Sequence, residues 1–303
     1  MNGFFQELAK KLAERWVALL VVPGALFVVS AVVGLHLGHG HALDWTMTSN
    51  YVTKTVERIA KLPGGAQAAV IVGLLLGASA TGLVVQAMAG VTRRFFLGTW
   101  PWPLRSLARW RTWRRRDRWD RLLERRADLV RAHPAGQRAP ERQEEIDEAA
   151  AKMNAIAMAR PGRPTWMGDR VHAVESVAWH RYGLDLTFVW PRLWLVLPET
   201  TRAEITAAHA SFAASVAVAS WAWPLLLLGV FWWPAAVAGL VVGAAGRVRA
   251  RDAAGDLTAL TESALDLHGR LLATALGAAA EDSSGPLTAD EGATITTVAR
   301  KGR

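Results

Sequence analysis

The stretch "AAHASFAASVAVASWAWPLLLLGVFWWPAAVAGLVVGAAG", residues 207–246, contains no Lys, Arg, Asp or Glu. As a single helix it would be about 60 Å long, twice the roughly 30 Å of a bilayer's hydrocarbon core. The stretch must therefore fold back on itself. Gly229–Pro234 supplies residues that break helices, together with Trp residues that favour the membrane interface. We predict a tight transmembrane hairpin with spans at about Ala207–Leu228 and Phe231–Gly246.

Two further charge-free stretches precede this hairpin, Trp16–Leu37 and Ala66–Val91, and each is long enough to cross a bilayer as a helix. The second contains Gly73 and Gly77, a spacing that lets helices approach closely in lipid but also arises by chance in a Gly-rich chain. The sequence therefore predicts an all-α, polytopic membrane protein with about four transmembrane helices and a cytoplasmic helical hairpin region.

Arginines follow the second and fourth predicted spans, whereas the turn between the third and fourth contains no Lys or Arg. By the positive-inside rule, this pattern predicts a multi-pass protein of the bacterial inner membrane with both termini in the cytoplasm. Basic residues in the predicted outer loop weaken the comparison for the first span. The predicted parts are 1–91 (an N-terminal helix and two spans, with an outer loop at 39–65), 92–206 (cytoplasmic helices), 207–246 (the hairpin), 247–280 (a cytoplasmic amphipathic helix) and 281–303 (a disordered tail).

The net charge of +9 is concentrated in one segment. Residues 93–126 contain 12 Arg and 3 acidic residues, and the remaining 23 basic and 23 acidic residues of the chain cancel. Within this segment, Trp residues are interleaved with Arg along a predicted helix at Leu104–Arg131. Such a mixture suits an anionic membrane surface or the phosphates and bases of nucleic acid, and a plain solvated helix is a third alternative.

We favour the membrane surface, because the segment begins within a dozen residues of the second predicted span. Anionic inner-leaflet lipids are then the expected partner, and nucleic acid is not. The residues predicted to contact anionic lipid are Arg93, Arg94, Arg105, Arg109, Trp110, Trp113, Arg114, Arg115 and Arg116.

A second helix is predicted at Glu141–Ala159, with five acidic residues in its first half and an apolar stripe that includes Ile146 and Met153. An antiparallel hairpin with the basic helix, turning at His133–Gly136, would pair the opposite charges. The alternative is a disordered acidic linker.

The stretch "RYGLDLTFVWPRLWLVLPE", residues 181–199, has an apolar part that is too short to span a bilayer, and Arg192 interrupts it. We interpret the stretch as a structural joint. Tyr182-Gly183 ends one helix, and Asp185 is the predicted N-cap of the next. The predicted motif residues are Asp169, Arg181, Tyr182, Asp185, Trp190, Pro191 and Arg192.

Two side-chain predictions follow for this joint. Trp190 and Trp194 are four residues apart, so they share a helix face and are expected to pack together in a buried core. Arg192 is expected either to pair with Asp185 or Glu199 or to extend to lipid headgroups.

Residues 164–199 resemble a block found in bacterial, chiefly actinobacterial, integral membrane proteins without a known activity. The resemblance implies such a membrane family and no catalytic role, and "RVHAVE" at 170–175 departs from the Arg/Ala-rich helix usual there. The residues that carry it are Pro164, Thr165, Gly168, Asp169, Glu175, Arg181, Tyr182, Gly183, Asp185, Trp190, Pro191, Arg192, Leu193 and Pro198.

The chain has no Cys, which excludes disulfides, thiol nucleophiles and cysteine-based zinc sites. Two polar groups could hold a metal or move protons: His36, His39 and His41 with Asp44, and the row Asp169, His172 and Glu175. Ordinary surface residues are the commoner explanation of both. We expect no catalytic residue, metal or cofactor.

Three classes of function remain open. The favoured one is a non-catalytic scaffold, sensor or signalling component at the inner leaflet, in contact with the bilayer and with an unidentified protein partner. The first alternative is an oligomeric channel or transporter, with Ser79 and Thr81 among the polar residues of the second span that could line a path. The second alternative is a membrane-associated enzyme acting through Asp169, His172 or Glu175.

Overall fold

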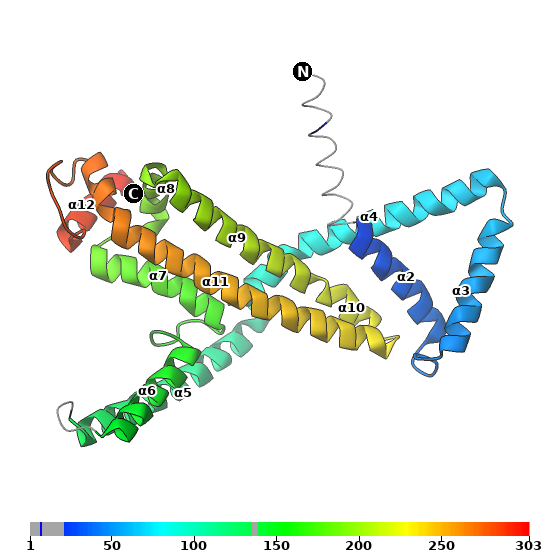
Figure 1. Cartoon of the computed structure of the whole chain (residues 1–303), viewed down its shortest axis with the longest axis horizontal. Helices are drawn as coiled ribbons and strands as arrows, with labels where there is room; N and C mark the ends of the chain where they lie inside the picture. The colour runs from blue at the N-terminus through cyan, green and yellow to red at the C-terminus, as the bar shows by residue number, and fades with distance from the viewer. Residues whose placement is uncertain (1–6, 8–20, 135–138, 303) are drawn as a thin grey trace. The chain divides into compact units, whose positions relative to one another are not determined.

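The computed structural model describes residues 7, 21–134 and 139–302, and every regular element in these ranges is a helix (Figure 1). The predicted all-α class is confirmed. The first part of the predicted span Trp16–Leu37 and part of the turn at His133–Gly136 lie outside the described residues. Two compact units make up the chain: the first unit comprises Met1–Thr92 and Ala214–Val248, and the second unit comprises Arg93–Ala213 and Arg249–Arg303.

The first unit contains α2 (Val22–Leu37), α3 (Trp45–Ala60), most of α4 (Gly64–Phe96) and α10 (Ala222–Leu228). The backbones of α2 and α4 touch at Gly24, where a Cβ atom would lie 2.0 Å from the carbonyl oxygen of Ala78. Only glycine allows that approach. The sequence predicted a loop over 39–65, whereas α3 forms there because Asp44 caps it by accepting from the backbone N–H of Met47 at 2.8 Å.

The chain reverses direction between α10 and α11 (Trp233–Ala275), at the Gly229–Pro234 segment that the sequence singled out. Small residues line the contact between the two arms: a Cβ atom on Gly246 would lie 2.7 Å from atoms of Ala219, and one on Gly243 would lie 3.1 Å from Ala222. The break between α9 (Glu199–Ser220) and α10 falls four residues before Pro224, which has no N–H to donate to Ser220.

Two helical stretches are long and apolar enough to cross a membrane by length and composition, namely α4 and Glu199–Leu228, which joins α9 to α10. α2 is a shorter apolar helix. α11 differs from the prediction of separate helices on either side of residue 247. It continues without a break from its apolar start through Arg247 to Ala275, because no proline interrupts it and Gly246 is held against Ala219.

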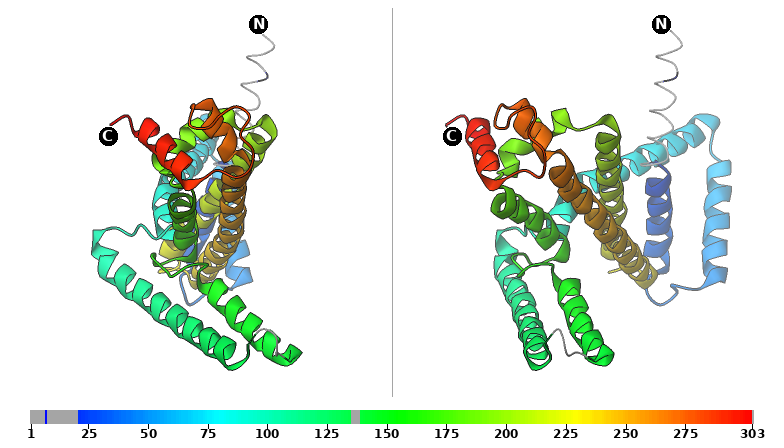
Figure 2. Two further views of the ribbon diagram at one scale, coloured as in Figure 1. Left: turned by 90° about the vertical axis from the view of Figure 1, so that its left-hand side faces the viewer. Right: turned by 60° about the vertical axis from the view of Figure 1, so that its left-hand side comes forward.

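The second unit begins with a hairpin of α5 (Arg105–Ala132) and α6 (Pro140–Ile156), which lie side by side in both views of Figure 2. Trp119 is the buried centre of this contact. It packs on Met153 and Ala157, and its indole N–H donates to the carbonyl of Ala157 at 3.0 Å. The expected pairing of charges across the hairpin takes another form: Glu145 and Glu148 pair within α6, and Arg160 beyond α6 pairs with Asp120 at 2.9 Å.

The RYGLD stretch joins α7 (Trp166–Tyr182) to α8 (Leu186–Val196). Gly183 has a φ of 67°, the left-handed conformation that ends α7, and Leu184 is buried. Asp185 caps α8 by accepting from the backbone N–H of Thr187 at 3.1 Å. The helix boundaries that the sequence placed at Gly183 and Asp185 are therefore present in the structure.

The last helix, α12 (Ala289–Arg300), differs from the predicted disordered tail at 281–303. Thr288 and Glu291 form a capping box, and Ile295 is fully buried in the core of the second unit. α12 packs against α7 and α8, and a Cβ atom on Gly292 would overlap the carbonyl oxygen of Tyr182. The tail folds because its few apolar residues complete a core that α7 and α8 leave open.

Candidate functional site

The first half of α5, together with the residues just before it, presents an exposed basic and aromatic surface. Trp102, just before the helix, is 78% exposed, and Trp110 and Trp113 are 51% and 62% exposed. The guanidinium group of Arg114 lies over the ring of Trp110 at 4.9 Å. We define the Arg/Trp face as the exposed residues Trp102, Arg105, Arg109, Trp110, Trp113 and Arg114. Arg93 and Arg94, at the end of α4, are also exposed.

Two of the arginines predicted to contact lipid also bind a loop of the second unit. Arg115 donates to the carbonyl of Ile156 at 2.7 Å and forms an ion pair with Asp169 at 2.6 Å. Arg116 donates to the carbonyl of Pro161 at 2.6 Å. Both contact the loop between α6 and α7. Arg115 is partly buried by these contacts, so we remove it from the predicted lipid-contact set, whereas Arg116 stays exposed and remains in the set. The sequence did not distinguish them, because their partners lie more than forty residues further along the chain.

Asp169 is 8% exposed and is fully engaged in this loop. Besides Arg115, it accepts the backbone N–H groups of Gly162 and Arg163 at 2.7 and 2.6 Å. His172 and Glu175 form a separate, exposed pair at 3.2 Å. The row Asp169, His172 and Glu175 is therefore divided between a carboxylate that holds the loop and an exposed pair.

The histidines after α2 are also divided among separate contacts. His36 stacks on Tyr51 with ring centroids 3.8 Å apart, and a ring nitrogen of His39 lies 2.9 Å from the carbonyl oxygen of Val230. His41 lies 3.9 Å from Asp44, which caps α3. Among the described residues, no group of three or more His, Cys, Asp or Glu is arranged to hold a metal ion.

A basic groove adjoins the Arg/Trp face. It has a volume of about 990 Å³ and lies where the chain leaves α4 and enters α5. Its lining combines three arginines with two indole rings: Arg105, Arg109, Arg163, Trp100 and Trp102. Arginine guanidinium groups beside indole rings can hold a phosphate and its apolar neighbour together.

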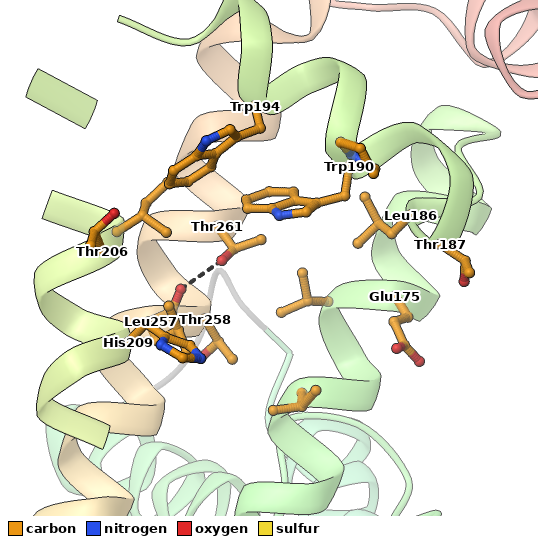
Figure 3. A pocket seen from close by; sticks show the side chains of 14 residues that line it. Glu175, Leu186, Thr187, Trp190, Trp194, Thr206, His209, Leu257, Thr258 and Thr261 are labelled. Carbon is orange, nitrogen blue, oxygen red and sulfur yellow. Dashed lines mark hydrogen bonds between the residues drawn. The ribbon is translucent and has the colours of Figure 1, made fainter. Parts of the chain in front are cut away.

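An apolar pocket of about 650 Å³ lies between α7, α8, α9 and α11 of the second unit. Trp190 and Trp194 project into it from α8, and their ring centroids are 6.1 Å apart (Figure 3). The two rings pack together as the sequence predicted, but they are only half-buried and line an open pocket. Val189 and Leu193, which lie about 100° round the helix from the two indoles, are fully buried in the core, against which Trp190 and Trp194 also pack.

The partner of Arg192 also differs from the prediction. Its guanidinium group donates to the carbonyl of Phe188 at 2.5 Å, within its own helix. Asp185, one of the expected partners, instead pairs with Arg300 of α12 at 2.7 Å. Pro191 is inside α8, where it removes one backbone donor. Arg181 lies over the ring of Tyr182 at 5.2 Å, and the Tyr182 hydroxyl donates to Asp266.

Two pKa values report on this joint. Burial, helped by the hydrogen bond to Asp266, raises the pKa of Tyr182 to about 12. The hydrogen bond from Arg300 lowers the pKa of Asp185 below its ordinary value. Both shifts follow from contacts within the second unit.

Comparisons of the chain with protein-family models, with curated proteins and with solved structures find no match. The resemblance of residues 164–199 to bacterial membrane proteins therefore stays a prediction.

Proposed function

We propose that this chain is a non-catalytic membrane protein whose second unit is held on the anionic inner leaflet by the Arg/Trp face. In this proposal the chain crosses a bacterial inner membrane about four times, and both termini lie in the cytoplasm. Its role is that of a scaffold, sensor or signalling component. The observation that carries the proposal is the exposure of Trp102, Trp110 and Trp113 among arginines, in a segment whose first exposed Trp is six residues after the end of α4.

The exposure of α4 supports the membrane part of the proposal. Only 17% of the most apolar part of α4 is buried, whereas the core helix of a water-soluble protein is mostly buried. Ile71 and Leu76, for example, are 58% and 65% exposed. So much apolar surface on one helix needs a cover, and lipid supplies it.

The composition of the Arg/Trp face supports attachment to lipid. Indole rings favour the headgroup region, and each arginine near an anionic leaflet contributes about 1 kcal/mol. Arg105, Arg109 and Arg114 together would contribute about 3 kcal/mol, which corresponds to a more than hundredfold preference for the attached state. The basic groove beside this face offers three arginines, two of them shared with the face, to phosphate oxygens.

The alternative of an oligomeric channel has less support from the polar residues of α4. The hydroxyls of Ser79 and Thr81 donate to the carbonyls of Leu75 and Gly77 at 2.7 and 2.8 Å, so they are used within the helix. Gln67 donates to Ala60 and Leu62.

A depth measurement tests the proposed attachment in the full chain. Because the sequence has no cysteine, a nitroxide can be placed at Ser106→Cys, between Trp102 and Trp110, with Thr297→Cys on α12 as the reference. In nanodiscs that contain phosphatidylglycerol, we expect the oxygen and nickel-chelate accessibilities at residue 106 to report headgroup depth, and those at residue 297 to report water. In 1 M salt, where the screening length is about 3 Å, residue 106 should move toward water.

Two triple variants test whether the position of the removed arginines matters or only the loss of three positive charges. Arg105→Gln, Arg109→Gln and Arg114→Gln remove three charges from the Arg/Trp face. The control Arg121→Gln, Arg131→Gln and Arg142→Gln removes three from exposed ion pairs elsewhere in the second unit. We expect only the first set to release residue 106 into water. A water-like signal at residue 106 in the parent protein, or equal loss in both sets, would refute the attachment.

A further inference from the structure

The apolar pocket between α7, α8, α9 and α11 is independent of the Arg/Trp face and has its own chemistry. We infer that it binds an uncharged, largely aromatic small molecule that carries a carbonyl-type hydrogen-bond acceptor. Its volume of about 650 Å³ is within the range of about 300–1,000 Å³ typical of small-molecule sites.

The walls of the pocket are mostly apolar, and they belong to helices that also pack in the core of the second unit. Leu186, Trp190 and Trp194 are on α8, which Val189 and Leu193 hold in the core. Val174 of α7 and Ile205 of α9 are themselves at least nine-tenths buried and close the sides. The pocket thus has a rigid frame, which lowers the entropic cost of ordering a site when a ligand binds.

The polar groups of the pocket favour a ligand that accepts hydrogen bonds. Within the described residues, neither the indole N–H of Trp190 nor the ring of His209 has a hydrogen-bond partner. The hydroxyl of Thr258 donates to Ala254 and Gly255, and that of Thr261 donates to Leu257 at 2.7 Å (Figure 3). The available donors therefore come from the rings, beside which an aromatic ligand would also stack.

The charges around the pocket argue for an uncharged ligand. No Lys or Arg is among the described residues that line it, so no permanently charged cation is present there to neutralise a carboxylate or a phosphate. Its only acidic residue, Glu175, is exposed at the edge, and the carboxylate lies 3.2 Å from a ring nitrogen of His172. A charged group in the apolar interior would lose its hydration without compensation.

Photolabelling of the full chain with benzophenone tests this inference. Benzophenone is uncharged and aromatic, has a carbonyl acceptor, and inserts into nearby C–H bonds under ultraviolet light, so mass spectrometry can map the adducts. In nanodiscs, we expect saturable adducts on 186–194 and 257–261. Trp190→Leu, which keeps an apolar side chain but removes the donor and the ring, should lower labelling at the pocket about fivefold.

Thr261→Phe should block the pocket by filling it, and Thr294→Phe is its matched control. Thr294 is exposed on α12 outside the pocket and donates to the carbonyl four residues earlier, as Thr261 does. Loss of pocket adducts in Thr261→Phe but not in Thr294→Phe, with unchanged unfolding temperatures, supports the inference. Adducts that persist in Thr261→Phe would overturn it. Adducts seen in detergent that disappear in nanodiscs would also overturn it, because an acyl chain would then be the occupant.

Discussion

Asp185 joins two otherwise separate parts of the sequence, and its two roles can be separated by substitution. Its carboxylate caps α8 through Thr187 and pairs with Arg300 of α12, 115 residues away. Asp185→Asn keeps a capping side chain but removes the charge that faces Arg300. Asp185→Ala removes both the cap and the pair.

The expected losses follow from the exposure of the partners. The cap contributes about 1 kcal/mol. Because the side chains of Arg300 and Asp185 are 38% and 19% exposed, solvent screens the pair and we assign it about 1 kcal/mol. Both Asp185→Asn and Asp185→Ala should therefore weaken the docking of α12 by about 1 kcal/mol, and Asp185→Ala should also loosen the start of α8 by about 1 kcal/mol. Each loss corresponds to amide exchange that is roughly fivefold faster, in α12 for the pair and at the start of α8 for the cap.

Hydrogen–deuterium exchange of residues 186–196 and 289–300, read by mass spectrometry, measures these losses locally. The lowered pKa of Asp185 adds a pH dependence, because its stabilising contribution is complete above the ordinary carboxyl pKa of about 4 and is lost as the pH falls through the lowered value. Protection of α12, corrected for intrinsic exchange, should decline in acid more in the parent than in Asp185→Asn. Asp282→Asn, at an exposed carboxylate, is the control. If Asp185→Ala exchanges α12 no faster than this control, the proposed joint is wrong.

Two further predictions use matched positions. Leu193→Ala should lower the free energy of unfolding by about 2–5 kcal/mol, because Leu193 is fully buried. The control Leu195→Ala, at a side chain that is 75% exposed, should change it by less than about 0.5 kcal/mol. Equal effects of the two variants in chemical denaturation would contradict the assigned faces of α8. Gly24→Ala should lower the unfolding temperature in detergent, because its Cβ would meet the backbone of Ala78. The control Gly77→Ala adds its Cβ to open space and should leave the unfolding temperature unchanged. An unchanged unfolding temperature in Gly24→Ala would rule out the close contact of α2 with α4.

Signals between neighbouring residues predicted several helix boundaries of the second unit. Gly183 and Asp185 marked helix boundaries because a left-handed cap and an N-cap depend on neighbouring residues alone. Trp119 and Met153 pack against each other between the two helices of the α5–α6 hairpin. The periodic spacing of apolar residues in the sequence indicated the stripe of α6 that contains Met153. The signal for α12 was also present, since Thr288 and Glu291 have the spacing of a capping box, but the surrounding polar residues suggested a disordered tail.

The candidate site depended more on contacts between distant segments. The arginines at 114 and 115 are adjacent in the sequence, yet Arg115 is partly buried and holds the loop before α7, while Arg114 stays exposed. The pocket forms only when α7, α8, α9 and α11 meet, so a face of α8 that looked like core became the wall of a cavity. No spacing within residues 181–199 carries that information.

Cysteine accessibility in intact cells tests the central claim, a membrane protein with its second unit in the cytoplasm, most directly. Because the chain has no cysteine, single cysteines can be placed at the exposed positions Asn50 on α3, Ala151 on α6 and Thr297 on α12. We expect a membrane-impermeant maleimide to label Asn50→Cys in intact spheroplasts, and to label Ala151→Cys and Thr297→Cys only after the membrane is permeabilised. Labelling of Ala151→Cys or Thr297→Cys in intact spheroplasts, or recovery of the chain in the soluble fraction, would contradict the account.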